Sequence, residues 1–199
     1  MVNGKALSGL TPQHAIRAGL AYVPQERKTE GLLLHKSVAV NMTLAILRQL
    51  RSLFGVIDPN AESAMVSEAI ARAQIRTQGG AQSIAHLSGG NQQKVLIEKW
   101  LKTAPAILLL NDVTRGVDIS TKRHIYQLIA DIAERGVAVI WYSTDARELV
   151  GVVHRVIVML QGQINAELLG HDVTVDRIVR ASVVGAAAES GEANGRRAH

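Results

Sequence analysis

The 199-residue sequence contains no cysteine, which excludes a disulfide framework and any thiolate metal site. Aromatic residues form only 3% of the chain while hydrophobic residues form 47%, so its core must be aliphatic. No stretch approaches the roughly 20 apolar residues of a membrane span, and the first ten residues lack the apolar segment of a signal peptide. The seven histidines never fall at the spacing of zinc ligands. These absences favour a cytosolic protein.

The chain is basic, with a formal net charge of +5 and a pI near 9.8. Such a balance can indicate nucleic acid or an anionic membrane surface as a partner. Here the lysines and arginines are spread along the chain, apart from the Arg196-Arg197 pair. Because no run approaches the basic clusters of polyanion-binding proteins, we expect a solvated basic surface and no nucleic-acid partner.

Short aliphatic runs alternate with helical patterns along most of the chain. The expected strands cover residues 20–23, 107–110, 137–142, 155–160 and 163–169. The expected helices cover residues 37–51, 59–75, 91–102, 120–135 and 146–153. This alternation predicts an α/β fold with a largely parallel sheet. Residues from about 185 onward are small and polar, which predicts a disordered tail.

The strongest local signal is the run LSGGNQQK over residues 87–94. Two adjacent glycines just before a helix let a backbone come close to an anion. The first turn of that helix then offers unpaired N–H groups and a positive dipole end, and Ser88 adds a hydroxyl donor. Taken alone, such a run is more often an ordinary helix start, so a phosphate site needs support from elsewhere in the chain.

That support comes from the segments around the run. An aliphatic strand ends in Asn111-Asp112, and Asp118 follows seven residues after Asn111. The runs LSGGNQQK and ILLLNDVTRGVD resemble the signature motif, Walker B strand and D-loop of ABC-transporter ATPases, in that order and spacing. NQQK and TRGVD are most similar to the second ATPase domain of ribose, xylose and galactose import ATP-binding proteins. The run GLAYVPQERK at 19–28 resembles their Q-loop, and STDAREL at 143–149 their switch segment; the resemblance covers about residues 1–182.

The resemblance implies an ABC-type P-loop NTPase fold, in part, with an α-helical subdomain. Residues 1–32 would be the remainder of an ATPase core, 33–103 the helical subdomain, 104–184 the rest of the core and 185–199 the tail. In this family two cassettes pack head to tail, with ATP and Mg²⁺ between the P-loop of one and the signature motif of the other. The implied partners are therefore a second cassette, a membrane permease and, indirectly, a periplasmic sugar-binding protein, at the cytoplasmic face of the membrane.

Roles for single residues follow from the same resemblance. The residues placed against nucleotide held by the partner cassette are Ser88, Gly89, Gly90 and Asn91, with Asp118 coupling the two nucleotide sites. The residues placed at the chain's own site are Gln25, near Mg²⁺ and the attacking water, Asn111 at the Walker B metal position, Asp112 at the catalytic glutamate and Thr144 at the switch histidine.

The sequence departs from the family pattern at the chain's own site. No G-x-x-x-x-G-K-[ST] run occurs, although that loop cradles the phosphates, so we expect the chain to begin after it. Asn111 replaces an aspartate, and an amide oxygen binds Mg²⁺ more weakly than a carboxylate. Asp112 is a methylene shorter than glutamate, and Thr144 replaces a histidine. An alignment with Asp112 as the Walker B aspartate would break the seven-residue distance to Asp118 and is rejected. The departures at the P-loop, Asn111, Asp112 and Thr144 together predict a degenerate site.

Plainer interpretations of these residues remain open. Asp112 could be a turn former at a strand end, Thr144 a loop residue and Gln25 a surface residue. Trp100 and Trp141 are most simply explained by packing, without a role in nucleotide binding. For the whole chain, the alternatives to an ATP-hydrolysing transporter subunit are a non-catalytic partner cassette, a nucleic-acid ABC protein and a gene remnant. NQQK, TRGVD and the lack of cysteine argue against the nucleic-acid protein.

We predict that the isolated chain does not bind Mg-ATP appreciably, because the missing loop supplies most phosphate contacts in P-loop proteins. Isothermal titration of the purified chain with Mg-ATP should give only heats of dilution. Saturable binding in the low micromolar range would contradict this prediction.

Overall fold

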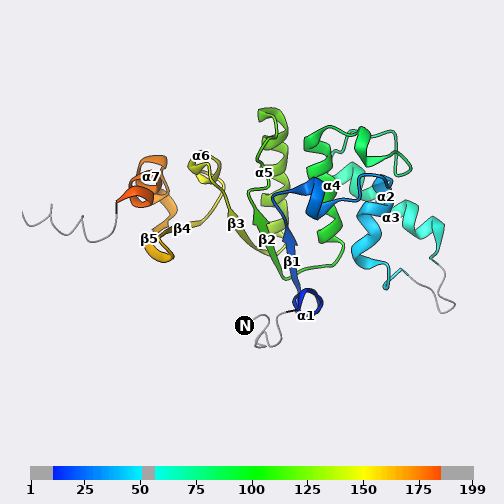
Figure 1. Cartoon of the computed structure of the whole chain (residues 1–199), viewed down its shortest axis with the longest axis horizontal. Coiled ribbons are helices and arrows are strands. Elements are labelled where there is room, and N and C mark those ends of the chain that lie inside the picture. The colour runs from blue at the N-terminus through cyan, green and yellow to red at the C-terminus, as the bar shows by residue number, and fades with distance from the viewer. Residues whose placement is uncertain (1–10, 51–56, 185–199) are drawn as a thin grey trace, which may run out of the picture. The chain divides into compact units, whose positions relative to one another are not determined.

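The computed structural model describes residues 11–50 and 57–184 (Figure 1). The predicted tail at 185–199 and the end of the helix predicted at 37–51 lie outside this range. The chain divides into two compact units, Met1–Tyr142 and Ser143–His199, which are considered separately below. No helix among the described residues combines the length and apolar character that a membrane crossing requires.

A three-stranded parallel sheet forms the centre of the first unit. Its strands are β1 (Leu20–Val23), β2 (Ile107–Asn111) and β3 (Ala138–Tyr142), in the order β1-β2-β3. Val23 lies opposite Leu110 on β2, and Asn111 lies opposite Tyr142 on β3, so the three strands end at the same edge. The predicted parallel sheet is confirmed for these strands.

The second unit contains an antiparallel hairpin of β4 (Arg155–Leu160) and β5 (Gln163–Leu169). Gln161 and Gly162 join the two strands with positive φ angles of 51° and 81°. Because a two-residue turn with positive φ at both positions reverses the chain, this pair cannot continue the parallel pattern. The two strands expected at 155–160 and 163–169, on either side of a Gln-Gly turn, are confirmed.

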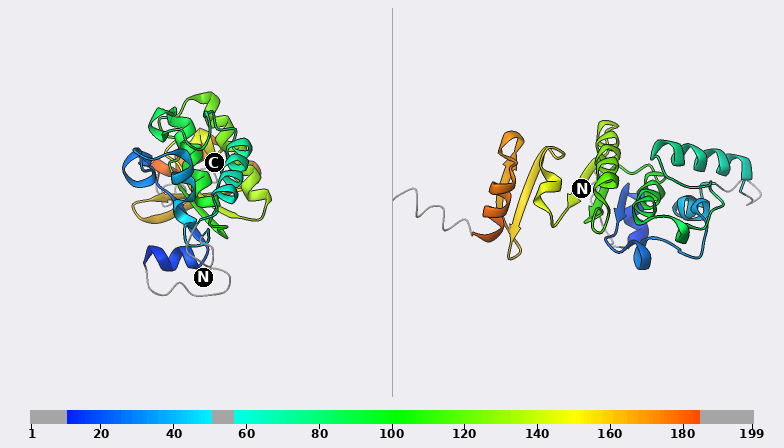
Figure 2. Two further views of the ribbon diagram at one scale, coloured as in Figure 1. Left: turned by 90° about the vertical axis from the view of Figure 1, so that its right-hand side faces the viewer. Right: turned by 90° about the horizontal axis from the view of Figure 1, so that it is seen from above.

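Helices and single helical turns connect the strands. The α-helices are α1 (Pro12–Arg17), α2 (Val38–Thr43), α3 (Pro59–Arg72), α4 (Gly89–Leu101), α5 (Ile119–Glu134), α6 (Ala146–Leu149) and α7 (Val175–Val183). Shorter turns are η1 (Arg27–Gly31), η2 (Leu44–Ile46), η3 (Ile84–His86) and η4 (Gly170–Asp172). Figure 2 shows α5 running beside the three strands of the first unit. Helices α1 and α7 were not predicted.

Two predicted helices are shorter than expected. The helix predicted from residue 37 ends at Thr43 and continues as the 3₁₀ turn η2. The Thr43 hydroxyl lies 3.0 Å from the Ala39 carbonyl oxygen and 2.8 Å from Glu62 Oε1, and such a contact with the preceding turn bends helices. The helix predicted at 146–153 stops at Leu149, and Gly151 beyond it has a φ of 79°.

The core of the first unit is aliphatic, as the composition predicted. Its fully buried side chains include Met42 of α2, Leu96 and Ile97 of α4, Leu108 of β2 and Ile125 of α5. Trp100 and Trp141 pack against this cluster, which confirms their interpretation as packing residues. The Trp141 ring lies 5.6 Å from that of Tyr126, between ring centres.

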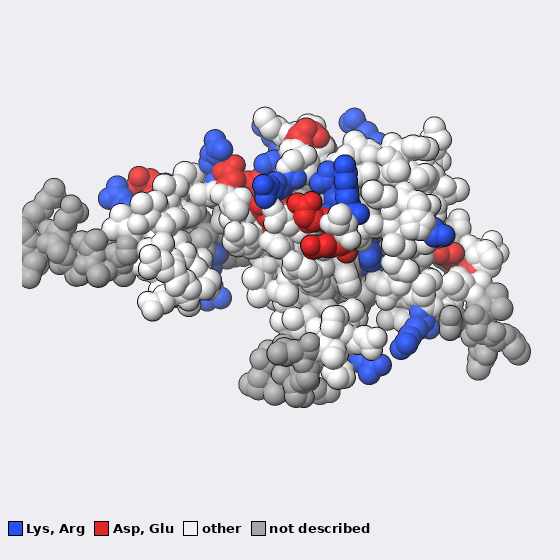
Figure 3. All heavy atoms as spheres, in the orientation of Figure 1, with Lys and Arg blue, Asp and Glu red and all other residues white. Residues whose placement is uncertain are grey.

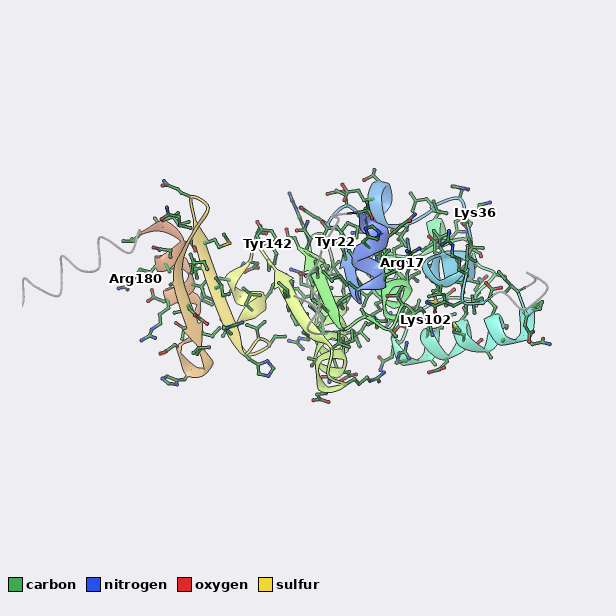
Figure 4. All side chains as sticks on the ribbon, turned by 90° about the horizontal axis from the view of Figure 1, so that it is seen from below. Arg17, Tyr22, Lys36, Lys102, Tyr142 and Arg180 are labelled. Carbon is green, nitrogen blue, oxygen red and sulfur yellow. The ribbon has the colours of Figure 1, made fainter. Side chains whose placement is uncertain are left out.

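One face of β3 is open in the first unit. Ile140 is 61% exposed and Tyr142 is 59% exposed, whereas Val139 and Trp141, which alternate with them along the strand, pack against the core. Figure 4 labels Tyr142 together with Tyr22, which lies on the other outer strand, β1. Among the described residues, β3 pairs with β2 alone. Unpaired edges and exposed apolar side chains promote association, so we expect the isolated chain to self-associate or unfold partially.

We predict that Ile140→Thr raises the monomeric fraction of the isolated chain without lowering its stability. Threonine keeps the β-branched shape that suits a strand and removes exposed apolar surface. Size-exclusion chromatography with light scattering measures the monomer, and thermal melts measure stability. The matched control is Val139→Thr, which should cost about 1 kcal/mol because Val139 packs on the core. Equal destabilisation by the two substitutions would show that the Ile140 side chain is packed against other residues rather than exposed to solvent.

Candidate functional site

Ser88 caps the N-terminus of α4 and is exposed there. Its Oγ accepts hydrogen bonds from the Asn91 backbone nitrogen at 3.4 Å and from Asn91 Nδ2 at 2.9 Å. Asn91 Oδ1 in turn accepts a hydrogen bond from the Arg76 backbone nitrogen at 3.0 Å. The predicted signature residues therefore form a capped helix start, in which the exposed Ser88 is held by the buried Asn91.

Ser88 and Asn91 lie on a hollow of about 650 Å³ that Asp118 also lines. The structure thus brings together three of the predicted nucleotide-contacting residues from α4 and the start of α5. Three further groups of the same hollow can carry positive charge, namely Arg76, Lys94 and His124. The hollow is consequently polar and has more basic than acidic side chains.

Sequence reasoning did not identify the basic groups of this hollow. Lys94 lies three residues beyond Asn91, so both occupy one face of a helix, and this spacing was a usable signal. Lys94 Nζ donates to the Gln74 carbonyl oxygen at 3.1 Å. Burial lowers the pKa of Lys94 and Arg76 adds to that effect, while the negative charge of Asp118 opposes it. Arg76 comes from the loop after α3 and has no local motif that could have revealed it.

Asp118 is the N-cap of α5. Its Oδ1 accepts hydrogen bonds from the Thr121 backbone nitrogen at 2.9 Å and from Ser120 Oγ at 2.6 Å, and its Oδ2 accepts from Thr121 Oγ1 at 2.7 Å. The hydroxyls of Ser120 and Thr121, followed by the Thr121 backbone N–H, hold the pKa of this carboxyl well below its usual range. Asp118 is therefore ionised and fixed in direction.

The two glycines after Ser88 differ in their surroundings. A Cβ on Gly90 would lie 2.9 Å from Thr121 Cβ and 3.0 Å from Thr121 Oγ1, and closer still to Thr121 Cγ2. A Cβ on Gly89 would meet only the flexible tip of Arg27, 2.6 Å from its Nη2. Gly90 is thus required for packing inside the chain itself, which adds a reason for this glycine beyond approach to an anion.

Gln25, Asn111 and Asp112 lie where β1 and β2 end. Gln25 is half-buried and follows β1, and Asn111 Nδ2 donates to Tyr22 Oη at 2.9 Å. Asp112 is buried, with a φ of 48°, and its backbone nitrogen donates to the Tyr142 carbonyl oxygen at 2.8 Å. The left-handed φ is one that aspartate and asparagine tolerate better than most residues.

The donor set at this edge fits Mg²⁺ poorly. Asn111 turns its amide nitrogen toward Tyr22, which leaves one neutral oxygen where a metal prefers a carboxylate. No three histidine, aspartate or glutamate side chains of residues 11–50 and 57–184 converge as metal ligands would. Thr144 belongs to the second unit, where it is exposed and lines a separate hollow of about 350 Å³ with Val175 and Ile178 of α7.

The turn η1, which follows Gln25, is attached to α4. Arg27 Nε donates to Gln92 Oε1 at 3.4 Å, and Lys99 Nζ donates to the Gly31 carbonyl oxygen at 2.9 Å. Lys99 is buried, and this burial lowers its pKa. On the face drawn in Figure 3, basic and acidic side chains lie next to one another rather than in fields of one sign.

A buried ion pair attaches α4 to α3. Arg72 Nη2 lies 2.5 Å from Glu98 Oε2, and the Glu98 side chain is fully buried. Arg72 also contacts Glu68 at 3.4 Å, but the Glu68 side chain is 71% exposed. Hydrogen bonding to Glu98 raises the pKa of the Arg72 guanidinium above its usual value. The pair fixes the C-terminal half of α4, two turns beyond Asn91 and one turn beyond Lys94.

The chain is similar to longer proteins of known name. A ribose import ATP-binding protein of Mesorhizobium japonicum is 41% identical over 185 residues, which are 92% of this chain and 36% of that protein. A xylose import ATP-binding protein of Yersinia pseudotuberculosis is 38% identical over 182 residues, with the same shares covered. A ribose import ATP-binding protein of Bacillus subtilis is 40% identical over 89% of this chain. The chain thus spans about a third of the length of these curated relatives. No protein-family model matches it.

Solved structures share the fold. The ATP-binding cassette MJ1267 of an ABC transporter has a TM-score of 0.71 at 18% identity, over 90% of this chain and 74% of that one. The ATP-binding cassette MJ0796, in a dimeric post-hydrolysis state bound to ADP and Pi, has a TM-score of 0.66 at 22% identity, over 79% and 66% of the two chains. The predicted fold class, part of an ABC-type P-loop NTPase fold, is confirmed.

We predict that Glu98→Gln lowers the free energy of unfolding by about 3 kcal/mol, because it leaves the Arg72 charge without its buried partner. Thermal melts measure the change, and hydrogen exchange should show weaker protection along α4. The matched control is Glu68→Gln, which removes an exposed partner of the same arginine and should change stability by less than about 0.5 kcal/mol. Equal effects of the two substitutions would contradict the importance of the buried pair.

Proposed function

We propose that this chain donates the signature motif to a shared ATP site in a monosaccharide importer. The chain belongs to the family of ribose and xylose import ATP-binding proteins and matches the C-terminal part of these longer proteins. The nucleotide of that site is held by a second cassette. The importer's permease receives the energy of hydrolysis, and the chain works peripherally at the cytoplasmic face of the membrane. A periplasmic sugar-binding protein supplies the permease.

The observation that carries this proposal is the start of α4. Ser88 presents an exposed hydroxyl at the N-terminus of a 13-residue helix, beside a hollow lined by Lys94 and Arg76. Helix N-termini and basic side chains both favour an anion such as the γ-phosphate. Ser88 and the Gly89 backbone would contact that phosphate, while Asn91 holds Ser88 in place. ATP supplies the phosphoryl group that is transferred to water.

Several features support a donated motif over a working site of the chain's own. Asn111 offers a neutral oxygen that is a weak ligand for Mg²⁺. In our proposal Gln25, Asp112 and Thr144 hold the positions of a water-positioning, catalytic and switch residue in a degenerate site. Asp112 is shorter than glutamate, and a misplacement of ~1 Å can lower a rate about a hundredfold.

We predict that Gly89→Leu lowers ATP turnover more than tenfold in an assembly of this chain with an intact cassette and permease, because the added side chain blocks the phosphate. A bulky residue at Gly90 would be a poorer test, since it collides with Thr121 within the chain. Asp112→Asn should change turnover less than threefold, because asparagine tolerates the left-handed backbone there and the site is already degenerate. The measurement is phosphate release by the assembly. If Asp112→Asn abolished turnover while Gly89→Leu left it intact, the chain's own site would be the working one.

A further inference from the structure

Thr121 is in contact with both of the motifs that line the large hollow. Its hydroxyl donates to Asp118 Oδ2 at 2.7 Å. Its methyl group and Cβ face Gly90 so closely that no side chain fits on that residue. On the first turn of α5, the half-buried Thr121 therefore contacts Asp118 of the predicted D-loop through its hydroxyl and Gly90 of the predicted signature turn through its methyl group.

We propose that Thr121 is a positioning residue that fixes the Ser88-Gly89-Gly90 turn and the Asp118 carboxylate relative to each other. Threonine suits this task because its two γ substituents are rigidly attached to one Cβ. The methyl contact sets how close the starts of α4 and α5 lie, and the hydroxyl bond sets where the carboxylate points. The role extends the proposed donation of the signature motif and rests on it for its effect on turnover.

The contact with Gly90 has a direct consequence for packing. Because Gly90 is buried against Thr121, the start of α4 and the start of α5 cannot move closer together without a collision. Asp118 also receives the Ser120 hydroxyl and the Thr121 backbone N–H, so its carboxylate has few directions left. In our proposal the turn at Ser88-Gly89-Gly90 and the Asp118 carboxylate therefore keep a fixed position relative to each other at the edge of the hollow.

Three further side chains lie around Asp118 in the hollow, and of these Lys94 interacts electrostatically with its carboxylate. Lys94 of α4, Arg76 of the loop after α3 and His124 of α5 line the hollow with it. His124 Nδ1 lies 2.9 Å from the Ser120 carbonyl oxygen, which orients its ring. Because none of these groups changes when Thr121 is substituted, a change in the behaviour of Asp118 can be assigned to the lost hydroxyl.

Three substitutions separate the two branches of the threonine. Thr121→Ser keeps the hydroxyl and removes the methyl group, Thr121→Val keeps the shape and removes the hydroxyl, and Thr121→Ala removes both. In the reconstituted assembly, Thr121→Val should lower kcat about tenfold with KM for ATP nearly unchanged, because the partner's loop binds the nucleotide and only its positioning is lost. Thr121→Ser, which loses only the methyl contact, should lower kcat less than Thr121→Val, and Thr121→Ala, which loses both contacts, should fall at least as far as valine.

The control for loss of a threonine hydroxyl at another helix start is Thr174→Val. Thr174 caps α7 in the second unit, where its Oγ1 accepts a hydrogen bond from the Arg177 backbone nitrogen at 3.4 Å. This substitution should lower thermal stability about as much as Thr121→Val and leave kcat unchanged. If both valine substitutions changed kcat only in proportion to stability, Thr121 would only stabilise the start of α5 and the positioning role would be overturned.

A double substitution tests the contact with Gly90 independently. Gly90→Ala alone should lower kcat more than tenfold, because its methyl group meets Thr121. In the Thr121→Ser background the closest of the three Thr121 atoms, Cγ2, is absent, so the loss should shrink at least threefold. Additive losses would overturn the proposed contact.

A spectroscopic readout does not depend on turnover. Carbon NMR of the Asp118 carboxyl in the full chain should show it ionised down to the lowest pH at which the fold persists, and likewise with Thr121→Ser. With Thr121→Val, protonation should begin at a higher pH, because a hydrogen bond to the ionised form is lost. An unchanged onset would contradict the hydroxyl's role.

If Gly89→Leu leaves turnover intact, the proposed function fails. If Gly89→Leu abolishes turnover and Thr121→Val has no effect, only the role of Thr121 fails.

Discussion

The structure of the first unit depends on the burial of α4. Every residue from Gly90 to Lys99 is buried, although the helix carries several polar and charged side chains. Buried polar groups are costly unless they are paired, so the neighbouring segments must bring partners to this helix. The pairs are Asn91 with the Arg76 nitrogen, Gln92 with the Ile84 carbonyl, Lys94 with the Gln74 carbonyl, Glu98 with Arg72 and Lys99 with the Gly31 carbonyl.

These pairs connect the candidate site to distant parts of the first unit. The turn η1 follows β1 and Gln25, and it reaches α4 through Lys99 and Gln92. Helix α3 reaches it through Arg72. A displacement of either segment therefore acts on the helix that begins at Ser88, because paired buried groups resist separation. The turn that follows Gln25 and helix α3 are thus both attached to the helix that begins at Ser88.

The two candidate ends of the site differ in their chemistry. The start of α4 combines a helix N-terminus, an exposed hydroxyl and the basic Lys94 and Arg76, which suits an anion. The ends of β1 and β2 combine a neutral amide with the buried Asp112, which suits a metal poorly. The start of α4 therefore suits contact with a phosphate better than the ends of β1 and β2 suit the binding of a metal and its nucleotide.

The sequence by itself determined the strands, the aliphatic core and the start of α4, because these depend on local periodicity, composition and capping residues. The family resemblance of its motifs also led to the expectation that Ser88, Asn91 and Asp118 serve shared nucleotide sites, and the three residues line one hollow. Only the tertiary structure decided that Gly90 packs on Thr121 and that Arg76 and His124 join the hollow. These features depend on contacts between segments far apart in the chain, for which no local pattern of residues is a sufficient signal.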